Sequence, residues 1–132
     1  AGADWLQALL GDAYRVIPVA LKSHVLHLDC AMALIQPGLV IHCPQKLIDG
    51  LPMSLRDWDK IEVSPEEATL LATNGLVLEP GRVVIDADNR RVIDELRRRK
   101  VDVIPLPFDG PIRLGGGLRC AHHPLLRESV LT

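Results

Sequence analysis

The sequence predicts an α/β protein built from a repeated strand–turn–strand–helix–strand unit. LIQPGLVIHC (34–43) and VLEPGRVVID (77–86) lie 43 residues apart and share one pattern: an apolar run, Pro-Gly and a second apolar run. Each segment is expected to form a β-hairpin with a tight Pro-Gly turn. A helical stretch and a further short strand follow both hairpins, so the repeat extends beyond the turns.

The closing strands of the two units are expected at KIEVS (60–64) and VDVIPLP (101–107). Ile61 and Ile104, which lie within them, are again 43 residues apart. Between hairpin and closing strand, the first unit offers only the segment SLRDWDK (54–60), for which we expect a short helix. The unit is therefore ββαβ, and its weaker helix belongs to the first copy.

The helix of the second unit is expected over DNRRVIDELRRRK (88–100). Its apolar residues share one face, with charged residues elsewhere: Val92, Ile93 and Leu96. Asp88 or Asn89 can cap its start. Between the units, the Ser-Pro-Glu-Glu start of 64–75 has the residues of a capping box and predicts another short helix.

The whole chain, 1–132, is expected to form a single domain. The expected division is 1–20 for the tail of a preceding unit, 24–64 and 74–107 for the repeated units, and 108–132 for the segment that carries the last cysteine. Residues 1–20 start with a helix and continue to a strand at 15–20. Because such units bury their faces against neighbours, we expect the chain to belong to a larger protein or to associate.

The composition excludes several classes of function. The 132 residues are 48% hydrophobic with a net charge of −2, which is typical of a globular domain and gives no electrostatic surface for nucleic acid. No apolar run is long enough to span a membrane. The three cysteines are an odd number without a secretory signal, which favours reduced thiols and a cytoplasmic location. We expect no nucleic-acid and no membrane partner.

The segment HVLHLDC (24–30) places polar residues just before the first hairpin. On a strand, His27 and Asp29 would point to the same face. Burying such a pair costs free energy unless the two side chains pair or act on a ligand. Two interpretations therefore stay open here: a paired surface histidine and aspartate, or a functional site.

The segment GGGLRCAHH (115–123) contains Cys120 shortly after three glycines. Glycine lets the backbone approach a ligand closely, and Arg119 with a nearby histidine would favour the thiolate. We therefore expect Cys120 to be the thiol most readily alkylated near neutral pH. The alternative is an inert buried cysteine, a common situation for free thiols.

A metal site is the remaining chemical alternative. Histidine and cysteine are numerous enough, but the sequence has no Cys-x-x-Cys pair, and His27 and Cys30 would face opposite sides of a strand. Adjacent His122 and His123 cannot easily bind one ion from extended backbone. We expect neither a metal ion nor another cofactor.

Three segments together resemble the guanidino-group-modifying (pentein) superfamily, which includes amidinotransferases and arginine deiminases. They are HLDCAMALIQPGLVIHCP (27–44), TNGLVLEPGRVVIDADN (73–89) and LGGGLRCAHHPL (114–125), in this order and spacing. The resemblance is greatest to the C-terminal part of the glycine and inosamine amidinotransferases. It implies a partial α/β propeller of ββαβ units, about two and a half of the family's five blades.

The resemblance also implies roles for individual residues. Cys120 would be the nucleophile that attacks the central carbon of a guanidinium group, and His27 would be the general acid and base. Asp29 would bind the guanidinium through charge-assisted hydrogen bonds. Lys46 stands where related amidinotransferases have an arginine that holds the donor's carboxylate. The substrate site would further include neighbours of the nucleophile: Gly116, Gly117 and Arg119.

The implied function is amidino transfer from arginine or another guanidino compound through a covalent amidino-cysteine intermediate. With water as the acceptor, the same site would be an arginine deiminase or another guanidino hydrolase. A truncated relative that acts only as a binding or assembly module and a metal-dependent hydrolase are the alternatives. Because the family's further carboxylates come from earlier blades, the isolated chain is expected to be weakly active or inactive without an N-terminal half or self-association.

Overall fold

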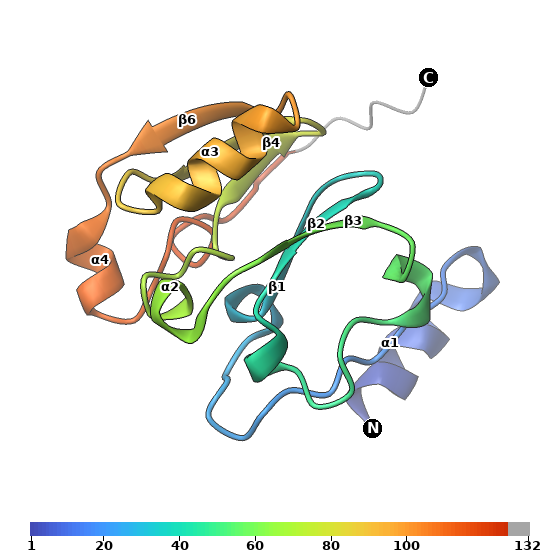
Figure 1. Ribbon diagram of the computed structural model, residues 1–132. Helices are drawn as coiled ribbons and strands as arrows, with labels where there is room; N and C mark the ends of the chain where they lie inside the picture. Colours follow the sequence, from blue (N-terminus) through green and yellow to red (C-terminus); the bar gives the residue numbers. More distant parts are fainter. Residues whose placement is uncertain (127–132) are drawn as a thin grey trace.

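The computed structural model describes residues 1–126 and contains two three-stranded sheets that lie side by side (Figure 1). The first sheet contains β1 (Met32–Gln36), β2 (Leu39–His42) and β3 (Asp59–Glu62), and the second contains β4 (Leu76–Glu79), β5 (Arg82–Asp86) and β6 (Asp102–Leu106). In each sheet the first two strands are antiparallel and the last two are parallel. Residues 127–132, the end of the expected segment 108–132, lie outside the described residues.

Both predicted hairpins are present. Three of the four pairings in the first hairpin have their equivalents 43 residues later, and both ladders are irregular at the same place. The turn glycines Gly38 and Gly81 have φ values of 86° and 83°. A Pro-Gly turn provides this geometry because proline fixes the preceding φ and glycine tolerates a positive one.

The second unit contains the longer connecting helix, α3 (Arg90–Arg98). Its predicted apolar face is buried: Val92, Ile93 and Leu96. Asn89 occupies the N-cap position, but within the described residues its side chain makes no capping hydrogen bond. Its Nδ2 atom donates instead to the carbonyl oxygen of Leu70 at 3.3 Å, which ties the start of α3 to the loop between the units.

The helix in the first unit is shorter than predicted. The connection between β2 and β3 contains two 3₁₀ turns, Pro44–Lys46 and Met53–Leu55, so the helix expected over 54–60 is wrong beyond the second turn, and β3 already begins at Asp59. Leu55 is the buried residue of the second turn. A single apolar anchor gives this segment no continuous face that packing could stabilise as a longer helix.

The segment between the units forms α2 (Pro65–Thr69), as its capping residues predict. Glu67 N donates to Ser64 Oγ at 3.2 Å, and Ser64 N donates to a Glu67 carboxylate oxygen at 2.9 Å. The same carboxylate pairs with Arg91 of α3, whose Nε lies 2.6 Å from Glu67 Oε1. The capping box is therefore confirmed, and it also carries an ion pair between the two units.

One hydrophobic core serves both sheets. Its most buried members come from both units: Ile35, Ile41, Val63, Val83, Ile85 and Leu96. Burial of apolar surface is the dominant favourable term in folding, so each unit depends on the other for stability.

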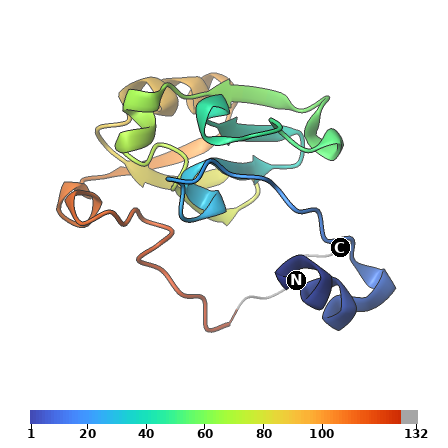
Figure 2. The same ribbon diagram turned by 90° about the horizontal axis from the view of Figure 1, so that it is seen from below.

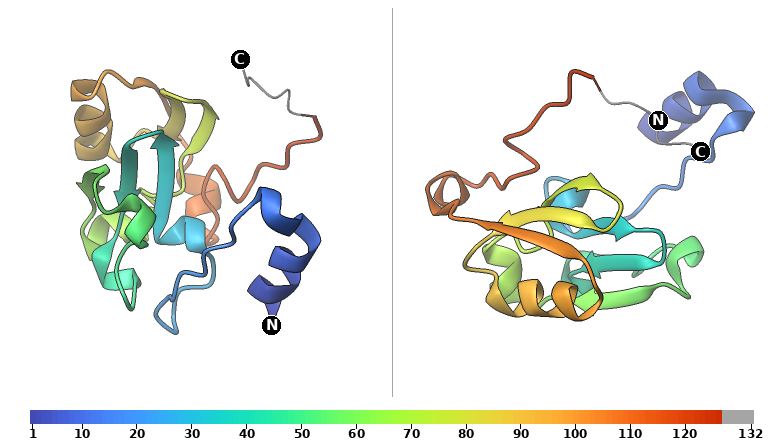
Figure 3. Two further views of the ribbon diagram at one scale, coloured as in Figure 1. Left: turned by 90° about the vertical axis from the view of Figure 1, so that its right-hand side faces the viewer. Right: turned by 90° about the horizontal axis from the view of Figure 1, so that it is seen from above.

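The N-terminal part lies apart from the sheets (Figures 2 and 3). Within residues 1–126, α1 (Gly2–Leu10) buries none of its side chains, and Trp5 is 67% exposed. The strand expected at 15–20 is wrong: Leu21 alone forms an isolated bridge, to Leu47. The segment contains a proline, which has no amide hydrogen to donate, and no strand of the described residues lies beside it. Among these residues, no helix is both long and apolar enough to cross a membrane.

After β6 the chain forms the short helix α4 (Asp109–Arg113) and then a loop, residues 114–120, here called the glycine loop. This loop returns to the segment before β4, where Arg119 N donates to the carbonyl oxygen of Asn74 at 3.1 Å. The glycine loop therefore reaches the side of the sheets at which the first strands begin.

Candidate active site

His27 and Asp29 lie just before β1 and not within a strand. His27 has extended backbone, Leu28–Cys30 form one 3₁₀ turn, and β1 begins at Met32. The predicted strand geometry is therefore wrong for this pair. The turn is closed by a hydrogen bond from Ala31 N to Leu28 O at 2.9 Å. It nevertheless places both side chains at one site.

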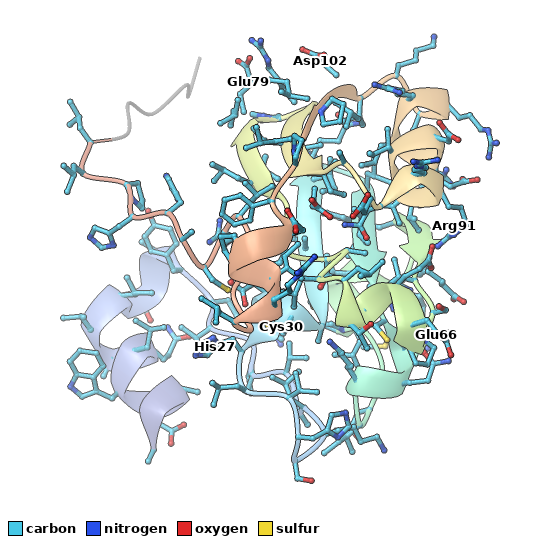
Figure 4. All side chains as sticks on the ribbon, turned by 90° about the vertical axis from the view of Figure 1, so that its left-hand side faces the viewer. His27, Cys30, Glu66, Glu79, Arg91 and Asp102 are labelled. Carbon is cyan, nitrogen blue, oxygen red and sulfur yellow. The ribbon has the colours of Figure 1, made fainter. Side chains whose placement is uncertain are left out.

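The structure brings His27, Asp29 and Cys120 together although 93 positions separate the first from the last. One imidazole nitrogen, one carboxylate oxygen and the thiol sulfur all lie within 4.8 Å of one another. His27 and Cys120 are exposed and Asp29 is half-buried. Figure 4 shows the face of the molecule on which His27 lies. The cluster contains the parts of a nucleophilic site: a thiol, a base within reach and a carboxylate.

A pocket of about 530 Å³ adjoins this cluster. It is lined by His27, Leu28, Asp29, Met32, Ala33, Leu34, Gly75, Val77 and Arg119. Three ionisable side chains contribute to this lining, those of His27, Asp29 and Arg119, and the rest of the wall is mostly aliphatic. Such a pocket suits a small ligand with a charged head and an apolar stem.

Two of the three consecutive glycines meet structural requirements of different kinds. Gly115 has φ 86°, a conformation that other residues rarely adopt. Gly117 lies against the side chain of Asn74, and a Cβ atom there would overlap it. Gly116 has room, because an added Cβ would meet only Cys120 Cβ at 3.8 Å. In the described structure, Gly116, Gly117 and Cys120 lie beside the pocket and not in its lining, so the role of the two glycines that the structure shows is to shape the loop.

The predicted site residue Lys46 is held by backbone carbonyl groups next to the site. Its Nζ donates to the carbonyl oxygens of Cys30 and Ala68 at 2.9 and 3.2 Å. Among the described residues it does not line the pocket. Its charge therefore fixes the backbone behind the site. Arg119 is the cation that does face the pocket.

The three thiols differ in environment. Cys43 is fully buried, whereas Cys120 is exposed. Burial, followed by the neighbouring Asp29 carboxylate, raises the pKa of the Cys30 thiol to about 11. Because the thiolate is the reactive form of cysteine, Cys30 is poorly suited to attack an electrophile, and Cys43 is shielded from one by its burial.

Sequence reasoning missed the contributions of Thr73 and Asn74, which are 0% and 1% exposed. Thr73 Oγ1 donates to the carbonyl oxygen of Asp29 at 2.9 Å. Asn74 Oδ1 accepts from the backbone N–H groups of Arg119 and Cys120 at 3.1 and 3.2 Å. The available signal was a pair of polar residues shortly before the predicted hairpin, which require partners when buried.

The cluster could also hold a metal ion. Histidine nitrogen, cysteine sulfur and carboxylate oxygen are all zinc ligands, and three protein ligands with an open position are typical of a catalytic zinc site. The same three side chains therefore fit either nucleophilic catalysis by the thiol or the binding of a metal ion.

No protein-family model matches the chain. The inosamine-phosphate amidinotransferase 1 of Streptomyces glaucescens is 33% identical over 143 aligned residues, covering 98% of this chain and 41% of that protein. The solved structure of an inosamine-phosphate amidinotransferase from Streptomyces griseus is 31% identical with a TM-score of 0.78, covering 91% of this chain and 38% of that one. The structure of an amidinotransferase from Microseira wollei, 24% identical, shares the fold with a TM-score of 0.83 and covers 99% of this chain and 42% of that one.

These likenesses define the fold as a partial pentein α/β propeller, which confirms the predicted fold class. The chain is related to the amidinotransferases over a segment that spans about two fifths of their length.

Proposed function

We propose that this chain is the C-terminal catalytic segment of an amidinotransferase that takes an amidino group from arginine or another guanidino compound. The observation that carries the proposal is the convergence of Cys120, His27 and Asp29 within 4.8 Å, beside a pocket of about 530 Å³. The relation to amidinotransferases supports the same chemistry.

In the first half-reaction, the Cys120 thiolate attacks the central guanidinium carbon and forms a C–S bond. The bond from that carbon to the alkyl-substituted nitrogen breaks, and protonated His27 donates its proton to the departing amine. The products are a free amine and a cationic amidino-cysteine thioether. Asp29 pairs with the N–H groups of the guanidinium and keeps the carbon over the sulfur.

In the second half-reaction, an acceptor amine attacks the same carbon. The C–S bond breaks, the Cys120 thiolate is restored, and neutral His27 takes the proton that the attacking nitrogen loses. With water as the acceptor, these same steps give urea, which is a hydrolase outcome. In the deiminase alternative, the bond from the central carbon to an unsubstituted nitrogen breaks instead, ammonia leaves, and water then displaces the sulfur to give a ureido product. The nucleophile and the general acid and base are the same in all cases, so the leaving nitrogen and the acceptor together decide the class of enzyme.

The rest of the pocket fits a donor with an aliphatic stem and an anionic end. Leu28 and Val77 contribute apolar wall beside Asp29. Arg119 would repel a guanidinium but attract a carboxylate, so we assign to it the anion contact that the resemblance gave to Lys46. Lys46 is already held by two backbone carbonyls.

We further propose that the isolated chain is incomplete as a cytoplasmic enzyme. Leu28 and Leu34 line the pocket yet are 43% and 51% exposed. A site that handles a covalent intermediate requires water to be excluded. The missing cover would come from the N-terminal part of the enzyme, since the chain spans 41% of its relative, or from a second copy.

The test uses arginine labelled with an isotope at the guanidino carbon, together with a primary amine. The 132-residue chain is assayed alone and with a polypeptide that supplies the N-terminal part of the fold. We expect labelled product and a labelled adduct on Cys120, both lost in Cys120→Ala and retained in the matched loop variant His123→Ala. No product and no adduct in either arrangement would favour a non-catalytic binding or assembly module.

A metal-dependent hydrolase is the second candidate, and the three ligand atoms within 4.8 Å favour it. Elemental analysis of the purified chain decides between the two. Stoichiometric zinc that is lost in both His27→Ala and Cys120→Ala would support this candidate against the amidinotransferase.

A further inference from the structure

We propose that Thr73 and Asn74 are positioning residues that align the two halves of the candidate active site. This inference rests on the proposed function, because it assigns the pair a task in the same site. One half is the turn that carries His27 and Asp29, and the other is the end of the glycine loop with Cys120. The two neighbouring residues contact one half each.

Thr73 and Asn74 connect the two halves of the site through hydrogen bonds. Among those of residues 1–126, none joins residues 27–31 directly to residues 114–122. The Thr73 hydroxyl reaches the carbonyl of Asp29, and the Asn74 carboxamide oxygen accepts from the N–H of Cys120. The distance between thiol and imidazole therefore depends on a dipeptide that belongs to neither half.

The fold of the repeat does not require an asparagine at this place. The residue 43 positions earlier is Ala31, which is fully buried and closes the equivalent turn: Ala31 N donates to Leu28 O, as Asn74 N donates to Leu71 O. The backbone turn thus forms with alanine in the first unit. What the carboxamide of Asn74 adds is the contact with the glycine loop.

The glycine loop can approach Asn74 closely because residue 117 has no side chain. A Cβ at Gly117 would overlap the Asn74 side chain, so the close approach exists only because residue 117 is glycine. The burial of Asn74 also has a cost, because its Nδ2 has no hydrogen-bond partner among the described atoms. A buried amide with one unpaired group is expected where its other contacts set a geometry that function requires.

Precise placement matters because the thiolate must attack along one direction while His27 delivers a proton. Small displacements of such groups lower rates strongly. Asn74 also holds the N–H of Arg119, so the same carboxamide orients the cation that lines the pocket.

The experiment compares variants that keep or remove each contact in the full chain. Asn74→Ala removes the acceptor, and Asn74→Asp keeps it. Thr73→Val removes the hydroxyl at nearly constant volume, and Thr73→Ser keeps it. The readouts are hydrogen exchange at the amides of Arg119 and Cys120, and the pH profile of Cys120 alkylation resolved by mass spectrometry. Neither readout requires catalytic turnover.

We expect Asn74→Ala to speed exchange at the Cys120 amide about tenfold or more and to change the alkylation–pH profile. The Arg119 amide should change less, because it keeps the backbone carbonyl of residue 74 as an acceptor. Asn74→Asp should restore the slow exchange at Cys120. Thr73→Val should change the profile and leave the two amides protected, whereas Thr73→Ser should match the wild type. If Asn74→Ala fails to fold, the contrast between Thr73→Val and Thr73→Ser decides. Unchanged exchange and unchanged profiles in the folded variants overturn the proposal.

The outcome is separable from that of the proposed function. If the wild type never forms an amidino adduct but the variants show these changes, the positioning role stands and the reaction assignment fails. If the adduct forms and the variants leave the profile unchanged, the reaction stands and the positioning role fails.

Discussion

The two ββαβ units share their strand order, their register and a spacing of 43 residues, yet they do different work. In the first unit, the segment before the hairpin carries His27 and Asp29. The equivalent positions of the second unit are Leu70 and Ala72. The second unit contributes Asn74, which fixes the glycine loop at 3.1 and 3.2 Å. The same backbone arrangement thus carries two candidate active-site residues in the first unit and a residue that holds the glycine loop in the second.

The units also differ in how they contribute to the core. The second contains α3 with Leu96 fully buried, whereas the first has a 3₁₀ turn whose equivalent residue, Met53, is 71% exposed. His27 and Asp29 therefore lie on the unit with less helical structure of its own. The second unit contributes the longer helix to the shared core.

The first prediction, with the largest expected effect, concerns the rate of amidino transfer after substitution of His27 or of its equivalent, Leu70. His27→Ala should lower amidino transfer by roughly 10²–10⁴-fold, because the general acid and base is removed. Leu70→Ala, 43 residues later, should leave the rate close to that of the wild type. Steady-state kinetics of the assembled enzyme measure both, and equal losses in the two variants would show that the units are not functionally distinct.

The second prediction concerns stability. Leu96→Ala should lower the free energy of unfolding by about 2–5 kcal/mol, because it opens a cavity in the shared core. Met53→Ala, the equivalent change, should alter it by less than about 0.5 kcal/mol, since the side chain is exposed. Urea unfolding gives both values. A larger loss for Met53→Ala would contradict the conclusion that, of the two connecting segments, only that of the second unit packs into the shared core at this position.

The third prediction sharpens the link between the second unit and the glycine loop. Gly117→Ala should cost roughly 1–3 kcal/mol and slow Cys120 alkylation, because the new methyl group overlaps Asn74. Gly116→Ala is the matched control and should behave almost as the wild type, since its Cβ has space. Thermal unfolding and alkylation rates together test this. Similar effects of the two substitutions would argue against the contact.

The smallest expected effect concerns His42, whose equivalent in the second unit is Ile85. Burial lowers the pKa of His42 below 6.5, although Glu62 opposes this and Lys60 adds to it. As the pH falls, the unfolded chain therefore protonates this histidine at a higher pH than the folded chain does. The free energy of unfolding then decreases as the pH drops below about 6.5 toward the lower pKa of the folded state. His42→Ile should flatten the dependence of unfolding free energy on pH in this window. An unchanged slope would exclude His42 as its source.

The repeat and the core helix were predictable because their signals are local and periodic. Pro-Gly turns, alternating apolar runs and the spacing of Val92, Ile93 and Leu96 each fix a structure within a few residues. The strand expected at 15–20 was wrong because a strand needs a neighbour, which a single segment cannot reveal. The placement of His27 and Asp29 on a strand was wrong because β1 begins only at Met32 and a 3₁₀ turn, Leu28–Cys30, precedes it.

The candidate site was predictable in its residue types and not in its contacts. Cys120 and His27 were found through their motifs. The contact of Asn74 with Cys120 spans 46 residues, and the anchoring of Lys46 on two carbonyls depends on backbone positions that only the folded chain defines. Tertiary hydrogen bonds of this kind leave no periodic trace in the sequence.

We infer above all that the Cys120 thiol and the His27 imidazole form one site, beside a single pocket, and that this thiol is the reactive one. Site-resolved alkylation of the folded chain near neutral pH tests it most directly. The account predicts that Cys120 reacts first, well ahead of Cys30 with its pKa of about 11 and of buried Cys43, and that His27→Ala changes the rate–pH profile of Cys120. Faster reaction at Cys30 or Cys43, or a profile indifferent to His27→Ala, would contradict it.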